Sequence, residues 1–216
     1  MISLKHNFIF IHPPKTGGNT IHNILKKYYE PNIKTLIINN SCGASQGVDF
    51  EINKNPLDKH SGYKQAKKAL KSLDIKEEIR LISTIRNPWE RIVSYYCWFN
   101  KTKRPNINAM KRWFQSNKLP PCTRFWNNED PYFVVRMEHY DADLPQLLYK
   151  LSIPIPDNLK QIHKNCSNWK KEEVTYRDFY KDNQENYDKE FIKLIGDFYK
   201  EDIDFSKKLF HKKYEF

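Results

Sequence analysis

The sequence predicts a three-layer α/β fold, with a mainly parallel central sheet, in one domain that spans residues 1–216. Two observations favour this fold class. Short apolar segments typical of buried strands alternate with amphipathic helical segments, and two of the strands end in loops that open a helix. The chain is also long enough to bury one substantial core, and no repeat or low-complexity linker divides it.

Four segments are predicted to be strands because they are short, rich in β-branched or aromatic residues, and bounded by polar or Pro-containing stretches. They are residues 7–11 (NFIFI), 33–38 (IKTLII), 80–85 (RLISTI) and 132–136 (YFVVR). Helices are predicted from apolar residues three or four positions apart, and one of them begins at a proline, which suits a first helical turn. One predicted helix follows Gly18, one spans 60–73, one begins at Pro88, and two more span 141–151 and 184–200. Residues 39–59 and 152–175 are predicted loops.

Composition and charge exclude several classes of protein. An aromatic content of 14% is too high for an unfolded polyelectrolyte, and no run of about 18 apolar residues could span a membrane. Residues 1–11 lack a signal-peptide core and cleavage site, so we expect a cytoplasmic protein. The net charge of +11 favours an anionic ligand: nucleic acid, acidic membrane, anionic glycan or a phosphorylated small molecule. Part of this charge is alternatively a solvated, lysine-rich face.

The cysteines predict no special chemistry. They stand far apart, at positions 42, 97, 122 and 166, and include no C-x-x-C pair. We therefore expect no zinc site and no disulfide framework, but free and mostly buried thiols. No metal is expected in the functional site.

The residues after the first strand are suited to binding a phosphate. The segment 14–20 (PKTGGNT) lies at the carboxyl end of a strand and opens a helix, which is where ligands bind in such sheets. Glycines let backbone N–H groups turn toward an anion, and a helix N-terminus adds partial positive charge. Lys15 adds a full charge, and three side chains can donate hydrogen bonds: Thr16, Asn19 and Thr20. Alternatively, Gly17 and Gly18 serve only a tight turn.

A second phosphate site is predicted where the strand 80–85 ends. Arg86 follows this strand, and its planar guanidinium suits phosphate. Ser94 lies about two helical turns further along, so both side chains could face one anion if the chain bends at Asn87 and Pro88. Alternatively, Arg86 forms a salt bridge at the strand end and Ser94 has no functional partner.

Together these segments resemble the PAPS-dependent sulfotransferases, where PAPS is 3′-phosphoadenosine-5′-phosphosulfate. Residues 8–20 (FIFIHPPKTGGNT) look like the family's 5′-phosphosulfate loop, and residues 83–96 (STIRNPWERIVSYY) look like its 3′-phosphate motif. The similarity is closest to the carbohydrate branch, the heparan sulfate 2-O-like sulfotransferases of family 2. Three later stretches also resemble that branch: residues 134–140 (VVRMEHY), 175–180 (TYRDFY) and 198–205 (FYKEDIDF). One departure is Pro13, where the family usually has an apolar residue.

The resemblance implies a P-loop-like sulfotransferase fold and an enzyme of the EC 2.8.2 type. Such an enzyme moves a sulfuryl group from PAPS to a hydroxyl of an acceptor, expected here to be a carbohydrate, and releases PAP. The resemblance further implies that Arg86 and Ser94 hold the 3′-phosphate, whereas the loop wraps the 5′-phosphate. The loop residues are Lys15, Thr16, Gly17, Gly18, Asn19 and Thr20.

The catalytic groups are predicted to be Lys15 and His60. Sulfuryl transfer needs positioning and charge stabilisation rather than a metal, and Lys15 would stabilise charge on the bridging oxygen as PAP leaves. His60 resembles the histidine that acts as general base in the family's K-H segment, and an ordinary histidine pKa suits that task. Alternatively, His60 is a surface or helix-capping residue. His12, beside the loop, is expected to orient it, and His139 is a weaker candidate for the base.

The acceptor is not identified by these motifs. Residues 39–57 and 100–130 match no part of the family that we can name, and we expect them to be substrate-side loops or insertions. The Trp residues between 89 and 126 either line a sugar-binding cleft or pack in the core. Tyr176 and Arg177 could close over the cofactor from a later loop.

Other functions fit parts of the sequence. A nucleotide-phosphate kinase or P-loop NTPase is disfavoured because Lys15 precedes the glycines, and because no strand ending in Asp is evident for Mg²⁺. A basic nucleic-acid-binding module depends on net charge alone, so we expect no nucleic-acid partner. A PAP-binding protein without activity is disfavoured by His60. The expected partner is a small-molecule or glycan acceptor with a free hydroxyl.

Overall fold

The computed structural model describes nine stretches of the chain, which form two compact units. The stretches are residues 1–28, 60–72, 74–75, 78–102, 106–127, 129–159, 174–182, 184–211 and 214–216. The first unit comprises residues 1–85 and 124–162, and the second comprises 86–123 and 163–216. Each unit is described by itself, and the assignment of residues 1–216 to one domain stays a prediction.

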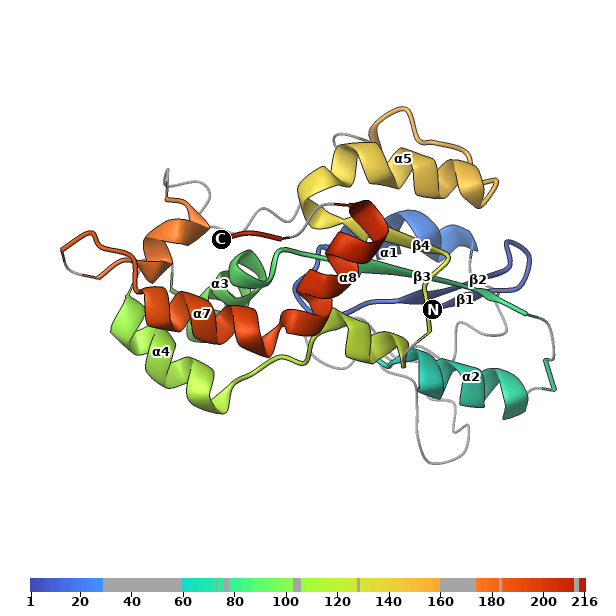
Figure 1. The fold of residues 1–216 in the computed structure, drawn as a ribbon. Coiled ribbons are helices and arrows are strands. Elements are labelled where there is room, and N and C mark those ends of the chain that lie inside the picture. Colours follow the sequence, from blue (N-terminus) through green and yellow to red (C-terminus); the bar gives the residue numbers. More distant parts are fainter. Residues whose placement is uncertain are drawn as a thin grey trace. The chain divides into compact units, whose positions relative to one another are not determined.

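The first unit is built on a four-stranded mixed sheet with the order β1-β2-β3-β4 (Figure 1). The strands are β1 (Ile2–Ser3), β2 (Phe8–Ile11), β3 (Arg80–Ile85) and β4 (Phe133–Arg136). The last three run parallel, with Ile9 opposite Leu81 and Ser83 opposite Val134, whereas β1 pairs antiparallel with β2. Three predicted strands are therefore confirmed, and the fourth, 33–38, lies outside the described residues.

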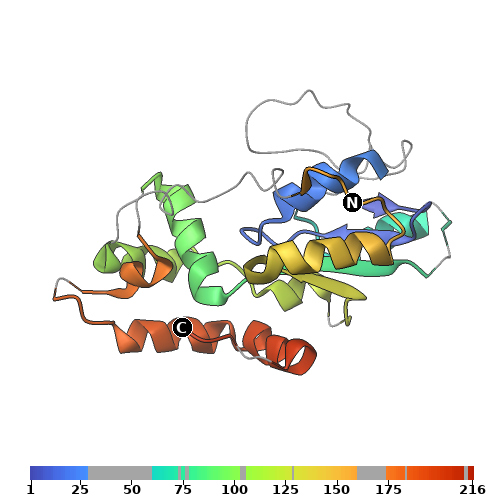
Figure 2. The same cartoon turned by 90° about the horizontal axis from the view of Figure 1, so that it is seen from above.

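Three helices cover this sheet. They are α1 (Gly18–Leu25), α2 (Tyr63–Ser72) and α5 (Tyr140–Lys150). Helices α1 and α5 lie on one face and α2 on the other, which confirms the predicted three-layer α/β fold class (Figures 1 and 2). Phe8 and Phe10 of β2 pack in one cluster with the apolar residues of α1 and α5, and all four β2 side chains are buried. A strand between two helical layers is buried on both faces, which explains its unbroken apolar sequence.

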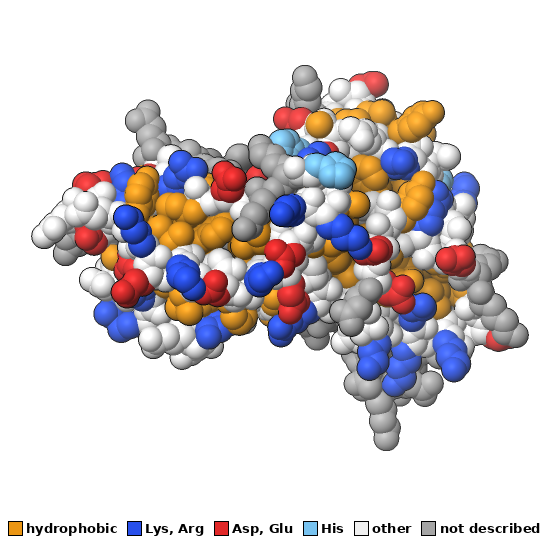
Figure 3. Space-filling view, viewed as in Figure 1, with side chains coloured by type: hydrophobic (Ala, Val, Ile, Leu, Met, Phe, Trp, Pro, Cys, Tyr) orange, Lys and Arg blue, Asp and Glu red, His pale blue; other side chains and the backbone are white. Residues whose placement is uncertain are grey.

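Helix α2 begins later than predicted, and this places His60 outside the helix. The sequence predicts a helix from His60, but α2 starts at Tyr63, where the Gly62 carbonyl accepts a hydrogen bond from the Ala66 N–H. Its solvent face carries four exposed lysines, Lys64, Lys67, Lys68 and Lys71, and basic side chains gather over α2 in Figure 3. Part of the net positive charge is therefore a solvated lysine face.

The second unit is helical. Its helices are α3 (Pro88–Asn100), α4 (Ile107–Ser116), α7 (Lys189–Phe198) and α8 (Lys200–Phe210), with the short 3₁₀ helix η6 (Tyr176–Tyr180). The 3₁₀ helix η3 (Cys122–Trp126) follows Pro120-Pro121, and its residues 124–126 already belong to the first unit, so the predicted 100–130 segment contains two helical pieces. The helices pack through a cluster rich in aromatic residues, including Trp89, Phe114, Tyr180 and Phe191.

The predicted helix 184–200 differs from the structure at both ends. Helix α7 starts only at Lys189, because the Asp188 carboxylate caps it by accepting from the Phe191 N–H. It ends at Phe198, and α8 follows directly. Leu194, which we predicted on the apolar face, is about half exposed, whereas Ile195 is fully buried. Among the described residues, no helix is long and apolar enough to cross a membrane.

Candidate functional site

The N-terminus of α1 has features that suit an anion. Its N-cap is Gly17, no side chain of the described residues caps it, and its first turn holds no acidic residue. The first amide N–H groups of a helix have no partner within the helix, and together they carry a partial positive charge. Lys15 stands two residues before this terminus, so the predicted phosphate loop has the electrostatics of an anion site.

The two glycines of this loop are required by its geometry. Gly17 has φ 78°, the left-handed region, and a Cβ there would collide with Met137 Sδ. A Cβ at Gly18 would lie 2.7 Å from His12 Cγ, 2.5 Å from its Nε2 and closer still to its Cδ2. Both glycines are therefore needed for the turn itself, and whether the loop also binds a phosphate stays a prediction.

Lys15 is held in a conformation that most residues avoid. Its φ is 66°, which costs a non-glycine residue backbone energy. Strain of this kind persists only where the surrounding structure imposes it, and it clusters at functional sites. Here the chain must leave β2, pass Pro14 and enter α1 within a few residues, and this path orients Lys15.

Three polar side chains of the loop take different positions. The Thr16 hydroxyl is buried, donates to the Pro13 carbonyl at 2.7 Å, and lies beside the Thr84 hydroxyl, so it braces the loop. Asn19 Oδ1 is buried and accepts no hydrogen bond from the part of the chain that the structure describes. Thr20 is buried next to Tyr140 at the start of α5. Burial raises the pKa of the Tyr140 phenol, and the nearby Thr20 hydroxyl lowers it in part.

His60 lies against the same loop through His12. The His60 Nδ1 is 2.8 Å from the His12 carbonyl oxygen, and the two ring centroids are 4.9 Å apart. A carbonyl only accepts hydrogen bonds, so Nδ1 carries the proton and the neutral ring presents its lone pair on Nε2. His12 is 3% exposed and stacks on Phe10 with centroids 5.9 Å apart. The structure thus brings His12, His60 and the loop of Lys15 together within the first unit.

Arg86 and Ser94 belong to the second unit, at the start of α3. The Arg86 Nη2 donates to Glu90 Oε1 at 2.7 Å, and both side chains are almost fully buried. Ser94 is also buried, one helical turn after Glu90. Arg86 therefore does form a salt bridge, and its role in binding a phosphate stays a prediction. The ion pair with Glu90 was not predicted, although the spacing of four residues between Arg86 and Glu90 could have indicated it.

The N-terminus of α3 differs from that of α1. The Asn87 carboxamide oxygen accepts from the N–H groups of Trp89 and Glu90 at 3.0 and 3.4 Å, and Glu90 places a carboxylate in the first turn. This helix end is therefore already satisfied, and an anion in the second unit would depend on the side chains of Arg86 and Ser94.

A buried ion pair connects α3 to α8. Arg91 and Asp202 are fully buried, with Nη1 and Oδ2 3.7 Å apart, and Arg91 also donates to the Pro120 carbonyl at 2.9 Å. The Asp202 carboxylate accepts from the N–H groups of Cys122 and Thr123. Sequence analysis did not single out Arg91 or Asp202, because their roles depend on contacts between residues far apart in the chain.

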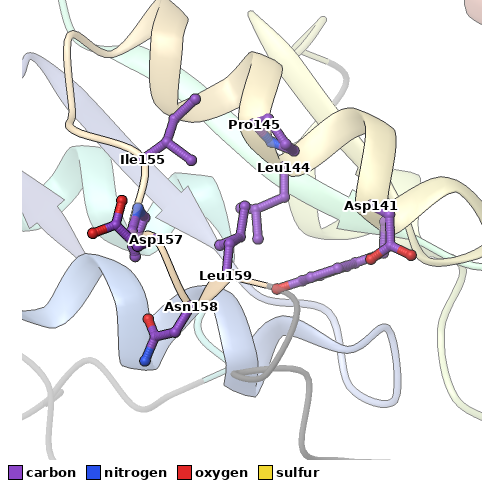
Figure 4. A pocket seen from close by; sticks show the side chains of 9 residues that line it. Asp141, Leu144, Pro145, Ile155, Asp157, Asn158 and Leu159 are labelled. Atoms are coloured by element: carbon purple, nitrogen blue, oxygen red, sulfur yellow. The ribbon is translucent and has the colours of Figure 1, made fainter.

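A pocket of about 590 Å³ lies beside α5 in the first unit (Figure 4). Its walls are the first two turns of α5 and the segment 155–159, with Leu144 and Leu159 on the apolar side. Two carboxylates, Asp141 and Asp157, also line it. They disfavour a phosphate or sulfate group, so the pocket suits an uncharged or cationic group. Tyr140 lines it too and is adjacent to Thr20 of the phosphate loop.

The remaining predicted residues have varied surroundings. His139 is exposed in the 3₁₀ helix η4 (Met137–His139), and no interaction with the phosphate loop is seen for it among the described residues. Trp89, Trp113 and Trp126 are buried, whereas Trp98 is 52% exposed. The described cysteines, Cys97 and Cys122, are free thiols, and no cluster of three potential metal ligands occurs in the described ranges.

Comparisons with known proteins give one match. The family model described as "Sulfotransferase family" matches residues 1–128, which is more than half of the chain and includes both predicted phosphate motifs. Searches of curated proteins and of solved structures each returned no match.

Proposed function

Because the chain belongs to the sulfotransferase family and is therefore a sulfuryl-transferring enzyme of the EC 2.8.2 type, we propose that its donor is PAPS and its acceptor a carbohydrate hydroxyl. PAP is then the second product. The resemblance of the motifs at residues 8–20 and 83–96 supports PAPS, which carries phosphate groups at both its 5′ and 3′ positions.

One observation carries the donor assignment: the uncapped N-terminus of α1, with Lys15 at its mouth. A helix end whose N–H groups are unsatisfied and whose neighbours are cationic binds an anion without rearrangement. The capped N-terminus of α3 offers no such site, so the phosphosulfate is assigned to the loop of the first unit.

The reaction needs one bond to form and one to break. The acceptor oxygen bonds to sulfur while the bond from sulfur to the bridging phosphate oxygen breaks, and that electron pair leaves with PAP. Lys15 stabilises the charge that develops on the bridging oxygen. His60 Nε2 takes the proton of the acceptor hydroxyl, a role that its hydrogen bond to the His12 carbonyl prepares by fixing the tautomer.

The 3′-phosphate is assigned to Arg86 and Ser94. The Arg86 Nη2 donates to the buried Glu90, and the planar guanidinium is the group whose N–H fork suits phosphate. Because PAP and 5′-AMP differ only in the 3′-phosphate, this site is expected to account for any preference of the protein for PAP over 5′-AMP.

The carbohydrate assignment is supported by the resemblance and by the acidic pocket of Figure 4. An uncharged part of a sugar is compatible with a pocket that contains Asp141 and Asp157, whereas these carboxylates would repel the phosphosulfate of the donor. Trp98, which is half exposed on α3, offers a second surface on which a sugar ring could stack.

Two measurements test the proposal. PAP is expected to raise the melting temperature without added Mg²⁺, and Lys15→Ala and Arg86→Ala should each abolish this shift. Stabilisation by ATP with Mg²⁺ but not by PAP would instead indicate a nucleotide kinase or NTPase. For transfer, radiolabelled PAPS is incubated with a panel of glycans, lipids and small alcohols. Label that reaches only non-carbohydrate acceptors contradicts the acceptor class alone.

The role of His60 is tested separately. His60→Ala should keep the PAP-induced shift and lose transfer, because the base touches the acceptor and not the nucleotide. Retained turnover by this variant would remove His60 from the role of base. His139→Ala is the matched control, because His139 is exposed and is expected to change neither measurement.

A further inference from the structure

The segment Tyr214–Phe216 is bound across the start of α3 in the second unit, and we call it the strap. The Asn87 Nδ2 donates to the Glu215 carbonyl at 2.9 Å, and the Tyr214 N–H donates to Ser206 Oγ at 3.1 Å. The strap therefore reaches the residue that directly follows Arg86 in the sequence.

Phe216 is held in a socket of four aromatic side chains. Its ring makes edge-to-face contacts with each of them, at centroid distances of 5.0, 5.4, 6.0 and 6.1 Å for Tyr180, Tyr187, Tyr176 and Trp89 in that order. This is the geometry that aromatic pairs favour, and each pair adds stabilisation beyond the area that it buries. The socket is preformed by the core, because Tyr180 is fully buried and donates to the Trp89 carbonyl at 3.0 Å.

Arg177 contacts Phe216 from the solvent side. Its Nη2 donates to the Phe216 carbonyl at 3.1 Å, and its guanidinium carbon lies 5.8 Å from the centre of the Phe216 ring. Tyr176 and Arg177, which from their place in the sequence could close over the cofactor, contact the strap in this structure. Ring and backbone contacts together fix the position of the neighbouring Glu215 carbonyl.

Asn87 connects the strap to the 3′-phosphate motif. Its Oδ1 caps the first turn of α3, and its Nδ2 is oriented by the Glu215 carbonyl, so both ends of the carboxamide are used. The capped turn includes Glu90, whose carboxylate holds Arg86. A chain of direct contacts therefore leads from Phe216, through Glu215, Asn87 and Glu90, to the guanidinium of Arg86.

We propose that the strap is a positioning element for the 3′-phosphate site, and that Phe216 and Asn87 are positioning residues that keep Arg86 in its phosphate-binding orientation. This inference depends on the proposed assignment of the 3′-phosphate to Arg86 and Ser94. Loss of the strap leaves the α1 loop unchanged, so binding of a 5′-phosphate is unaffected, whereas recognition of a 3′-phosphate weakens.

The test measures the affinities of PAP and 5′-AMP, which differ only in the 3′-phosphate, by titration calorimetry below the melting temperature. Phe216→Ala should weaken PAP binding about tenfold and leave 5′-AMP binding unchanged, which reduces the preference for PAP by the same factor. Phe216→Tyr should restore the preference, because a second aromatic ring can fill the socket. Leu209→Ala, at an exposed position of α8 outside the socket, is the matched control and should change neither affinity.

A second variant tests the connecting residue. Asn87→Ser keeps an N-cap acceptor but removes the Nδ2 donor, so α3 stays capped while the link to Glu215 is lost. It should reduce the preference for PAP as Phe216→Ala does, with little change in melting temperature.

The outcomes separate the two proposals. If wild-type protein binds PAP clearly more tightly than 5′-AMP and Phe216→Ala keeps that preference, the strap has no positioning role. Equal weakening of both nucleotides would also overturn it, because a general loss of structure has that effect. If the wild-type protein shows no preference for PAP, the assignment of the 3′-phosphate to Arg86 is wrong, and the inference falls with it.

Discussion

Gly18 is the residue at which a single methyl group should disturb both the phosphate loop and the base. In Gly18→Ala, the new Cβ would lie 2.7 Å from His12 Cγ and 2.5 Å from His12 Nε2, far inside van der Waals contact. The ring cannot move away easily, because it is 3% exposed and lies between Phe10 and His60. We therefore expect either α1 or His12 to shift.

The magnitude follows from the cost of overpacking. Adding a methyl group to a filled site destabilises a protein by about 1–3 kcal/mol. The helix-propensity gain of alanine is small at the first residue of a helix, so we expect a loss of about 2 kcal/mol. For a chain of this length, that corresponds to a fall in melting temperature of roughly 4–8 °C. PAP binding should weaken as well, because the displaced residue begins α1 at the anion site.

The assay is a double-mutant cycle read by thermal unfolding and by PAP titration. His12→Ala removes the ring that the new methyl group would meet, so the double variant Gly18→Ala/His12→Ala should be more stable than the sum of the two single effects predicts. Strict additivity would show that His12 is not the obstacle. Wild-type stability and wild-type PAP affinity in Gly18→Ala would refute the packing argument altogether.

Three further predictions concern the second unit. Arg91→Met should destabilise the fold by about 3–5 kcal/mol because it leaves the buried Asp202 carboxylate without its cation, and the double variant Arg91→Met/Asp202→Leu should recover part of the loss in denaturant titrations. Partial burial raises the pKa of the Asp188 carboxyl. Hydrogen bonds from a lysine of α4 and from the backbone lower it by more, so the pKa lies below its ordinary value of 3.8. The stability that the Asp188 carboxylate contributes is present above its pKa in the unfolded chain, and it is lost as the pH falls through its pKa in the folded protein. Asp188→Asn can still cap α7, so this variant should flatten the acid limb of a stability–pH curve below about pH 4. Burial raises the pKa of the Cys122 thiol well above its usual value, so of the two described cysteines a maleimide should modify Cys97 before Cys122 in native protein, and mass spectrometry should find Cys122 modified only after unfolding.

Much of the fold could be predicted because it depends on local patterns. The strand over 80–85 has the predicted bounds, and helix α3 begins at Pro88 as predicted, with Asn87 as its cap. Strand β1 was missed because two residues carry no periodicity. The helix predicted over 184–200 was too long at its start, because a capping carboxylate at Asp188 interrupts a stretch whose composition alone still favours a helix.

The candidate site was predicted in part. The sequence indicated which residues form the two phosphate motifs, since glycine, lysine and threonine at the end of a strand have few other uses together. It did not indicate that the Thr16 hydroxyl braces the loop, that Glu90 holds Arg86, or that His60 lies against His12. Each of these facts depends on the direction of a side chain, which residue spacing does not define.

The sequence by itself determined the alternation of strands and helices, the family, and the positions of both phosphate motifs, because periodicity and short motifs are properties of neighbouring residues. The tertiary structure decided which of the two helix ends is capped by a side chain, which side chains are already engaged, and that residues 214–216 lie at the start of α3. These features arise from contacts between residues up to 128 positions apart, such as Asn87 with Glu215, and packing selects such contacts only when the whole chain has folded.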